Sequence, residues 1–479
     1  MDKAGLLVQL IVPDTATMRE TLRVIDGNAY GVGFVVDKNG CLKGVVTDGD
    51  IRRAILRDVP LEAKVTQFMT ANPVFARRDI ASEKLIGLMS ERVKYVPITD
   101  DVGKVVDFAA YAHQVHLPMA SPTFPGNELR YVMECVLKNR ISSQGRFVTE
   151  FENAFAKFCG VKHGIAVSNG TVALHLALVL ADVGPGNEVI VPTLTFIATA
   201  NAVRYTGATP VFVDSEPETW GMDVEQVERK ITSRTKAIVP VHLYGHPVEM
   251  DRINALAEKH HLIVIEDAAE AHGATYKGRK VGSLGHIGCF SFYANKIVTT
   301  GEGGMLTTND DRLAKRATIL RDHGMSKDRK YWHDEVGYNY RMTNLQAAVG
   351  VAQMEQVASL LEQRAAVEVS YCEWLEQDAR IELPKSVSWG QRVNWLYTVL
   401  LRDGIDRDLI MKFLQDKGID SRPVFYPVHS MPPYAGAESF PVADRISRRG
   451  LSLPTYARMQ RAEIERACKM LRLSLDEAS

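Results

Sequence analysis

The segment Leu262-Ile-Val-Ile-Glu-Asp-Ala-Ala-Glu-Ala-His-Gly273 joins a short apolar run to three carboxylates. Such a run is typical of a buried strand, and ligands of parallel sheets gather where the strands end. Downstream, Ser291-Phe-Tyr-Ala-Asn-Lys-Ile-Val-Thr-Thr-Gly-Glu-Gly-Gly304 places Lys296 in a short polar loop between apolar stretches.

Helical patterns and short apolar runs alternate from residue 127 to about residue 350. Buried strands are predicted at residues 189–191, 210–214, 237–241 and 262–267, separated by helical patterns such as residues 251–259. This alternation predicts an α/β fold with a mainly parallel sheet that is covered by helices on both faces. Residues 356–479 are predicted to begin with a long helix and to form a smaller C-terminal domain.

Lys296 and Asp267 together fit the requirements of pyridoxal phosphate chemistry. A lysine amine forms a Schiff base with the cofactor aldehyde, and a carboxylate keeps the pyridine nitrogen protonated so that the ring acts as an electron sink. Each residue alone has a simpler explanation. One lysine among 57 Lys and Arg residues is ordinarily a solvated charge, and an aspartate after a strand often caps a helix.

With residues 125–132, 141–145, 337–348 and 421–434, the two segments resemble the DegT/DnrJ/EryC1/StrS aminotransferases, a branch of the fold-type I pyridoxal phosphate enzymes. The resemblance covers about residues 115–475. It implies that Lys296 is catalytic and that Asp267 faces the pyridine nitrogen. Dehydratases of the superfamily carry histidine in place of this lysine, so Lys296 favours transamination.

The turn at residues 168–171 opens a helix, and the unpaired amides of a first helical turn bind anions. The resemblance assigns the cofactor phosphate to this turn, with Gly170 and Thr171 closest and a hydroxyl from Ser291. It also implies that Phe196 lies against the pyridine ring. Glu270 stands where many relatives have glutamine, and is expected to reach the phenolic oxygen of the cofactor.

Asn339 is expected, by the same resemblance, to contact the phosphate of the neighbouring subunit, which makes a homodimer the minimum functional unit. The implied substrates are a nucleotide-linked 4-keto-6-deoxy sugar, with GDP-4-keto-6-deoxymannose the best match, and glutamate as amine donor. Arg422 and His429 are expected to face the nucleotide sugar. The alternative for these two is a surface arginine and a packed histidine.

Two other functions remain open at this stage. A UDP- or dTDP-linked keto sugar, or amination at C3, would keep the chemistry and change the pocket. A non-catalytic, nucleotide-sensing regulator would use the same fold without turnover.

Residues 31–50 and 94–108 form an internal repeat of strand, turn and strand, preceded by amphipathic stretches at residues 18–25 and 83–89. This resembles a tandem cystathionine-β-synthase (CBS) pair within residues 1–115. Gly44, Thr47 and Asp50 match the nucleotide-binding motif of that family. The second copy carries Lys104, Asp107 and Ala110 at the corresponding positions. At most one nucleotide site is expected, and a dimerisation unit without ligand is an equal alternative.

A length of 479 residues suggests about three units, and the predicted boundaries are 1–115, 116–355 and 356–479. The balance of 57 basic and 58 acidic residues leaves a net charge of -1, which gives no general attraction to nucleic acid or to a membrane surface.

An apolar run closed by Pro13 is interpreted as a first strand and not as a signal peptide, and no run reaches the ~18 residues of a membrane helix. A cytoplasmic location is therefore expected. The six cysteines show neither Cys-x-x-Cys spacing nor clustering with histidines, so neither metal nor disulfide is expected.

Overall fold

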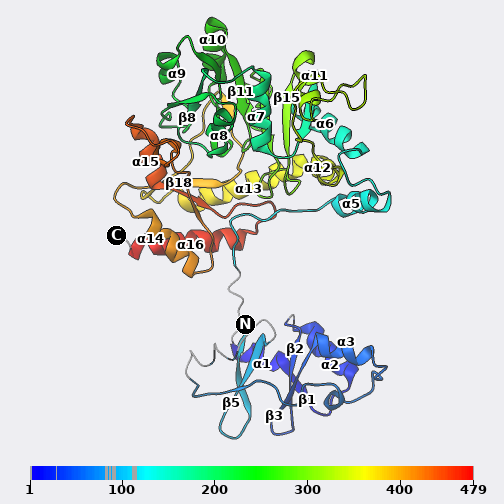
Figure 1. Cartoon of the computed structure of the whole chain (residues 1–479). Coiled ribbons are helices and arrows are strands. Elements are labelled where there is room, and N and C mark those ends of the chain that lie inside the picture. The colour runs from blue at the N-terminus through cyan, green and yellow to red at the C-terminus, as the bar shows by residue number, and fades with distance from the viewer. Residues whose placement is uncertain are drawn as a thin grey trace. The chain divides into compact units, whose positions relative to one another are not determined.

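The computed structural model describes residues 3–28, 30–80, 85, 88, 93–110 and 116–477 (Figure 1). The chain forms two compact units, Met1–Val115 and His116–Ser479. The additional boundary at residue 355 stays a prediction.

The first unit contains two three-stranded sheets with the same topology. In one sheet, β1 (Ile11–Pro13) runs parallel to β2 (Val32–Val36), which pairs antiparallel with β3 (Leu42–Thr47). In the other sheet, β4 (Ala76–Arg77), β5 (Tyr95–Thr99) and β6 (Val105–Ala110) repeat this order of pairings. The internal repeat of the sequence is therefore present in the strand pairing.

The two copies meet in one of the apolar cores of this unit. The rings of Phe34 and Phe108 are buried with centroids 5.9 Å apart, and the amide of Leu42 donates to the carbonyl of Gly103 at 3.0 Å. The helices of the unit are α1 (Lys3–Leu10), α2 (Met18–Gly27), α3 (Asp48–Ile55) and the 3-10 turn η1 (Val65–Gln67). The amphipathic stretch predicted at residues 83–89 lies outside the described residues, apart from residues 85 and 88.

The prediction of a strand at the amino terminus was wrong for most of its length. Residues 3–10 form helix α1, and only residues 11–13 form strand β1. A short apolar run suits a buried helix and a buried strand equally, so its periodicity does not distinguish them. The pairing of the strand with β2 determines where the helix ends. Ile11 opposes Phe34 in the sheet, whereas Leu10 before it is buried at the end of the helix.

The second unit is built on a seven-stranded sheet whose strand order is β7-β15-β14-β11-β10-β8-β9. Only β15 runs antiparallel to the others, so the predicted mainly parallel sheet is confirmed. The strands are β7 (His163–Val167), β8 (Glu188–Pro192), β9 (Thr209–Val213), β10 (Thr235–Ile238), β11 (Ile263–Asp267), β14 (Ile287–Ser291) and β15 (Gly304–Thr308).

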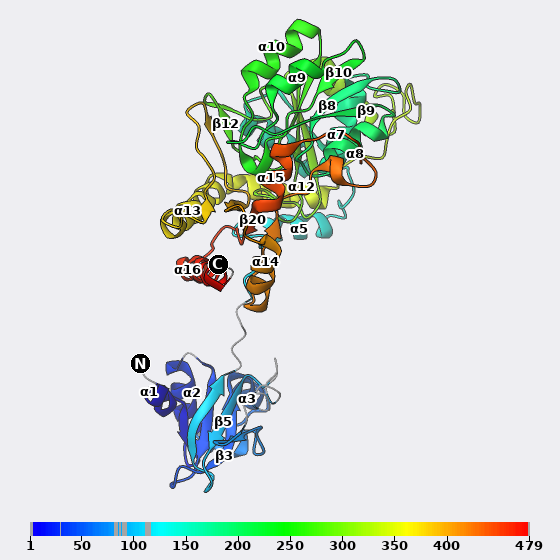
Figure 2. The ribbon, with the colours of Figure 1, turned by 90° about the vertical axis from the view of Figure 1, so that its left-hand side faces the viewer.

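Helices cover both faces of this sheet (Figure 2). Alternate residues of each strand point to opposite faces of the sheet and belong to two separate cores. Ile190 and Val264 lie in one core, and the other contains Val189, Val191 and Ile265. The first core is closed by α5 (Glu128–Leu137), α6 (Arg146–Cys159), α9 (Val224–Lys230), α10 (Met250–His260) and α12 (Asn344–Glu355). The second is closed by α7 (Gly170–Leu180), α8 (Ala198–Tyr205) and α11 (Asp311–Leu320).

The C-terminal part adds an antiparallel sheet of order β16-β18-β20-β19 with its own core. Its strands are β16 (Ile381–Glu382), β18 (Tyr397–Leu401), β19 (Arg422–Pro423) and β20 (Gly450–Leu453), and its helices are α13 (Val357–Leu375), α14 (Arg407–Asp416), α15 (Pro441–Arg449) and α16 (Arg461–Glu477). A small sheet of β12 (Thr275–Tyr276), β13 (Arg279–Lys280) and β17 (Gly390–Gln391) joins this part to the large sheet. None of the described helices is long and apolar enough to cross a membrane.

Candidate active site

Asp267 is the last residue of β11, at the carboxyl edge of the large sheet. Its side chain is buried, and its carboxylate accepts hydrogen bonds from the Thr199 hydroxyl at 2.8 Å and from the Ala269 amide at 3.2 Å. Burial raises the pKa of Asp267, while the Thr199 and Ala269 hydrogen bonds and the charge of Lys296 act in the opposite direction. A cationic ring placed against this carboxylate would compensate its burial.

Lys296 lies in the loop between β14 and β15, and its side chain is only 11% exposed. Its Nζ is 3.9 Å from a carboxylate oxygen of Glu270 and 3.8 Å from the ring centroid of Trp395. Burial lowers the pKa of Lys296, and the nearby carboxylates only partly oppose this effect. The amine is therefore buried and close to one carboxylate, and its pKa lies below that of an exposed lysine.

Glu270 is buried beside this lysine and is held by the backbone. One carboxylate oxygen accepts a hydrogen bond from the Tyr244 amide at 2.8 Å, and the other faces Lys296. Burial raises the pKa of Glu270 to about 7, despite the charge of Lys296. Tyr244 makes this contact from a left-handed backbone conformation, with φ 49° and ψ 28°.

The predicted phosphate turn is the amino terminus of α7. Asn169 caps this helix by accepting a hydrogen bond from the Val172 amide at 2.9 Å. A Cβ atom on Gly170 would lie 2.7 Å from the Cβ of Ser291, so glycine allows the helix terminus to approach the end of β14. Gly170 and Ser291 therefore lie against each other, and Thr171 follows in the first turn of α7. That these residues hold a phosphate stays a prediction.

Three further residues predicted for the site have exposed side chains: Phe196, Asn339 and Arg422. Phe196 is 55% exposed with its ring 5.8 Å from that of Phe425, which leaves it accessible to a flat ligand. Asn339 is exposed, and its side chain accepts a hydrogen bond from Arg341 at 3.1 Å. Arg422 is exposed at the start of β19, and its charge lowers the pKa of Lys296.

His429, in contrast, uses both ring nitrogens inside the chain. Its Nδ1 is 2.7 Å from the Thr193 hydroxyl, its Nε2 is 3.4 Å from Asp444, and its ring packs on Phe440. This geometry favours the packed-histidine alternative, and Arg422 remains the better candidate for an anionic substrate group.

In the first unit, the predicted nucleotide residues lie around the start of α3. Thr47 and Asp50 form a capping box for this helix, and Asp50 also pairs with Arg53 at 2.7 Å. Gly44 is required by packing, since a Cβ atom there would lie 2.6 Å from Met69 Sδ. A pocket of about 460 Å³ beside Thr47 is lined by both copies of the repeat, from Tyr30 and Asp48 to Lys94 and Tyr95.

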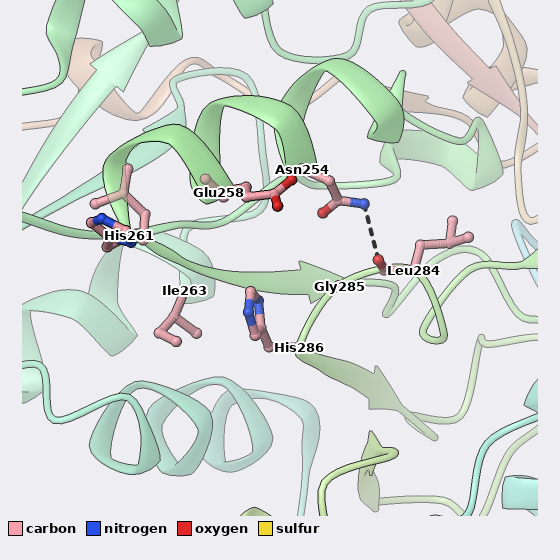
Figure 3. A pocket seen from close by; sticks show the side chains of 9 residues that line it. Asn254, Glu258, His261, Ile263, Leu284, Gly285 and His286 are labelled. Atoms are coloured by element: carbon pink, nitrogen blue, oxygen red, sulfur yellow. Dashed lines mark hydrogen bonds between the residues drawn. The ribbon is translucent and has the colours of Figure 1, made fainter.

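A further pocket, of about 550 Å³, lies elsewhere in the second unit. Figure 3 shows it beside α10, where Asn254 donates to the Leu284 carbonyl at 3.0 Å near His261 and His286. It occupies the amino end of β11, whereas Asp267 ends that strand. This pocket is therefore at the opposite edge of the sheet from Asp267. Within the described ranges, no group of three or more His, Cys, Asp or Glu residues is arranged to hold a metal.

Three residues that contact the site were not predicted from the sequence: Thr199, Tyr244 and Trp395. Tyr244 follows β10 closely, so its place after a strand end was a usable signal. Trp395 carried no such signal, because only the folding of the C-terminal part brings it to Lys296.

The buried lysine, the buried aspartate and the glycine-lined helix terminus at one sheet edge define a pyridoxal phosphate-dependent aminotransferase. Residues 124–472 match the profile of the DegT/DnrJ/EryC1/StrS aminotransferase family, and the chain belongs to this family. Residues 9–57 match the CBS domain, so that profile covers the first copy of the repeat.

Relatives and solved structures agree with this assignment. A GDP-perosamine synthase of Caulobacter vibrioides is 52% identical over 364 residues, which is 74% of this chain and 97% of the relative. The GDP-perosamine synthase of Escherichia coli O157:H7 is 44% identical, covering 74% of this chain and 98% of the relative. The structure of S. venezuelae DesV superposes with a TM-score of 0.69 at 37% identity, covering 72% of this chain and 94% of DesV.

Proposed function

We propose that this enzyme transfers an amino group from glutamate to C4 of a GDP-linked 4-keto-6-deoxy sugar, with GDP-4-keto-6-deoxymannose as the best candidate, for surface polysaccharide synthesis. The observation that carries the chemistry is the buried Lys296 amine between Glu270 and Trp395, at the same sheet edge as Asp267. The sugar is inferred from the GDP-perosamine synthases, whose length the chain covers almost completely.

The positions of the residues support the following roles. The pyridoxal phosphate supplies the electron sink when it is bound. Asp267 would hold the proton on its ring nitrogen, while Gly170, Thr171 and Ser291 would hold its phosphate. Lys296 would retain the cofactor between turnovers and, once released, carry the proton between the substrate carbon and the aldehyde carbon.

Arg422 is the proposed contact for the diphosphate of the sugar nucleotide. Its guanidinium is exposed and close enough to lower the pKa of Lys296. We expect Arg422→Ala to raise the KM for the sugar nucleotide about tenfold and to change the KM for glutamate much less. Equal effects on both constants in steady-state kinetics would contradict this role.

The homodimer remains part of this proposal. Asn339 has its side chain exposed and would contribute to the phosphate site of a second copy. On α5, several large apolar side chains are exposed, which is unusual for a surface that faces only water. They are Leu129, Met133, Val136 and Leu137.

The first unit is proposed as a regulatory nucleotide site. The pocket beside Thr47 supports it, because both copies of the repeat line that pocket. The alternative is a dimerisation unit that has lost its ligand, which the capping role of Asp50 favours. Equilibrium binding of adenine and guanine nucleotides to the full-length protein distinguishes the two: no binding at millimolar concentration excludes the sensor.

The decisive experiment is a single turnover. Enzyme loaded with pyridoxamine phosphate is mixed in turn with GDP-, UDP- and dTDP-linked 4-keto-6-deoxy sugars, while the absorbance of the lysine-linked cofactor and the mass of the product are followed. Recovery with the GDP sugar alone supports the proposal, and recovery only with another nucleotide reassigns the substrate. Absence of any recovery, with cofactor still bound, supports the non-catalytic regulator. Lys296→Ala is the control and should show no recovery.

A further inference from the structure

Trp395 contacts the catalytic loop through two different parts of its side chain. Its indole Nε1–H donates a hydrogen bond to the Asn295 carbonyl at 3.0 Å, and Asn295 immediately precedes Lys296. The face of the same indole lies 3.8 Å from Lys296 Nζ. One side chain therefore holds both the backbone before the lysine and its amine.

Trp395 itself is fixed in place from the C-terminal part. It is only 3% exposed, and its carbonyl accepts a hydrogen bond at 2.8 Å from Arg364, a buried residue of α13. Its ring stacks on Tyr244 with centroids 5.8 Å apart and an angle of 21° between the planes. Tyr244 in turn stacks on Phe425 at 5.3 Å. The indole therefore has little freedom to turn away from Lys296.

The contact between the Trp395 ring and Lys296 Nζ is also electrostatic. An aromatic face attracts an ammonium ion, and the attraction is largest where water is excluded. Within the described part of the chain, Lys296 Nζ has no hydrogen bond, so Trp395 and Glu270 are the groups that place it. A lysine side chain without such contacts would sample several rotamers.

We propose that Trp395 is a positioning residue for Lys296: its N–H fixes the lysine loop and its ring face holds the amine where the cofactor aldehyde arrives. This inference rests on the proposed function, because it concerns the capture of pyridoxal phosphate. In that step the neutral amine condenses with the aldehyde, a carbon–nitrogen double bond forms, and the aldehyde oxygen leaves as one water molecule.

Two variants distinguish the N–H contact of Trp395 with Asn295 from the contact of its ring face with Lys296. Trp395→Phe keeps an aromatic face and loses the N–H, whereas Trp395→Leu loses both. The rate of pyridoxal phosphate capture by cofactor-free, full-length protein is measured by absorbance between about pH 6 and pH 9. We expect the limiting rate at high pH to fall in both variants, about tenfold in Trp395→Leu. The apparent pKa of Lys296 should fall further in Trp395→Leu than in Trp395→Phe, because only leucine removes the ring face.

A second ligand distinguishes positioning from a general loss of structure. The analogue 4-deoxypyridoxine 5'-phosphate carries the ring and the phosphate but no aldehyde, so its affinity should change less than about twofold in either variant. Trp389→Phe is the matched control, since Trp389 packs on Tyr276 and His246, away from Lys296. It should leave capture and analogue binding unchanged.

Each result has one meaning. Slower capture with unchanged analogue binding supports the inference. Unchanged capture in both variants, or a parallel loss of capture and analogue binding, overturns it while the proposed function stands. Wild-type protein that captures no cofactor overturns the proposed function and this inference with it.

Discussion

Three ionisable side chains occupy the catalytic edge of the sheet, and burial perturbs all of them. It raises the pKa of Asp267 and of Glu270 and lowers the pKa of Lys296. Each shift moves its group toward the neutral form, because a charge loses hydration when it is buried. A cationic ring bound beside Asp267 would therefore favour the charged form of this carboxylate.

Asp267→Asn tests the partner of the ring nitrogen. Asparagine has nearly the same shape and can still accept the hydrogen bond from Thr199, so the fold should be retained. Without the negative charge the ring nitrogen loses its proton, and the half-reaction with glutamate should slow by roughly 10²-fold or more. Stopped-flow absorbance measures this rate. A rate equal to that of the wild type would exclude the assigned role.

Glu270→Gln tests the perturbed carboxyl. The folded pKa of about 7 lies above the ordinary range, so the stability that Glu270 contributes is present at low pH and is lost as the pH rises toward 7. Glutamine has no such dependence. In cofactor-free protein, the Tm of the variant relative to wild type should therefore rise by about 2–4 °C between about pH 5 and pH 8.

The control for this prediction is Glu258→Gln, which changes an exposed carboxylate on α10. Its Tm should follow that of the wild type at every pH. Parallel Tm curves for Glu270→Gln and wild type would show that Glu270 is not the group that titrates near neutral pH.

At the scale of elements, the site depends on how closely the amino terminus of α7 approaches the end of β14. Two glycines make this approach feasible. A Cβ atom on Gly170 would meet Ser291, and one on Gly304 would lie 2.3 Å from the Asn169 carbonyl. The helix terminus is thereby held against the sheet edge, with its unpaired amides available to an anion.

Gly170→Ala should therefore weaken cofactor binding. The added methyl must displace Ser291 or the helix terminus, and we expect the Kd for pyridoxal phosphate to rise about tenfold or more. Fluorescence titration measures this constant. Gly184→Ala is the matched control, because its Cβ would meet nothing within 4 Å. If both variants bind the cofactor as the wild type does, the turn is not the phosphate site.

At the scale of the whole molecule, the proposed active site needs two copies of the chain. Lys296 and Asp267 belong to one sheet edge, whereas Asn339 lies after α11 with an exposed side chain. A residue that serves the neighbouring copy has no reason to contact the cofactor residues of its own chain. Its known contacts, with Arg341 and Asp322, are compatible with that arrangement.

Mixing two inactive variants tests this arrangement. If Lys296→Ala and Asn339→Ala are each inactive, a mixed dimer contains one site in which both residues are intact. Unfolding and refolding an equal mixture should then restore about one quarter of the wild-type activity. Refolding each variant alone is the control. No recovery from the mixture, although mixed dimers are present, would place Asn339 in the site of its own chain or outside both sites.

The sequence predicted the alternating fold well because strands β8 to β11 are short, apolar and separated by helical patterns. The sequence predicted the structure poorly where a local pattern was compatible with two different structures. Residues 6–10 suit a helix and a strand equally, and pairing with β2 begins only at Ile11. His429 shows the same limit for a side chain, since its contacts with Thr193 and Asp444 join distant segments.

The sequence by itself determined the family and the cofactor, and it predicted which residues perform the chemistry, because these depend on residue types at fixed local spacing. The tertiary structure decided the environment of those residues. Trp395 reaches Lys296 only after the C-terminal part has packed on the large sheet, whereas Tyr244, which follows β10, meets Glu270 between the ends of two strands of the large sheet. Burial then shifts the pKa of each group, and desolvation is a property of the folded surroundings that no local pattern contains.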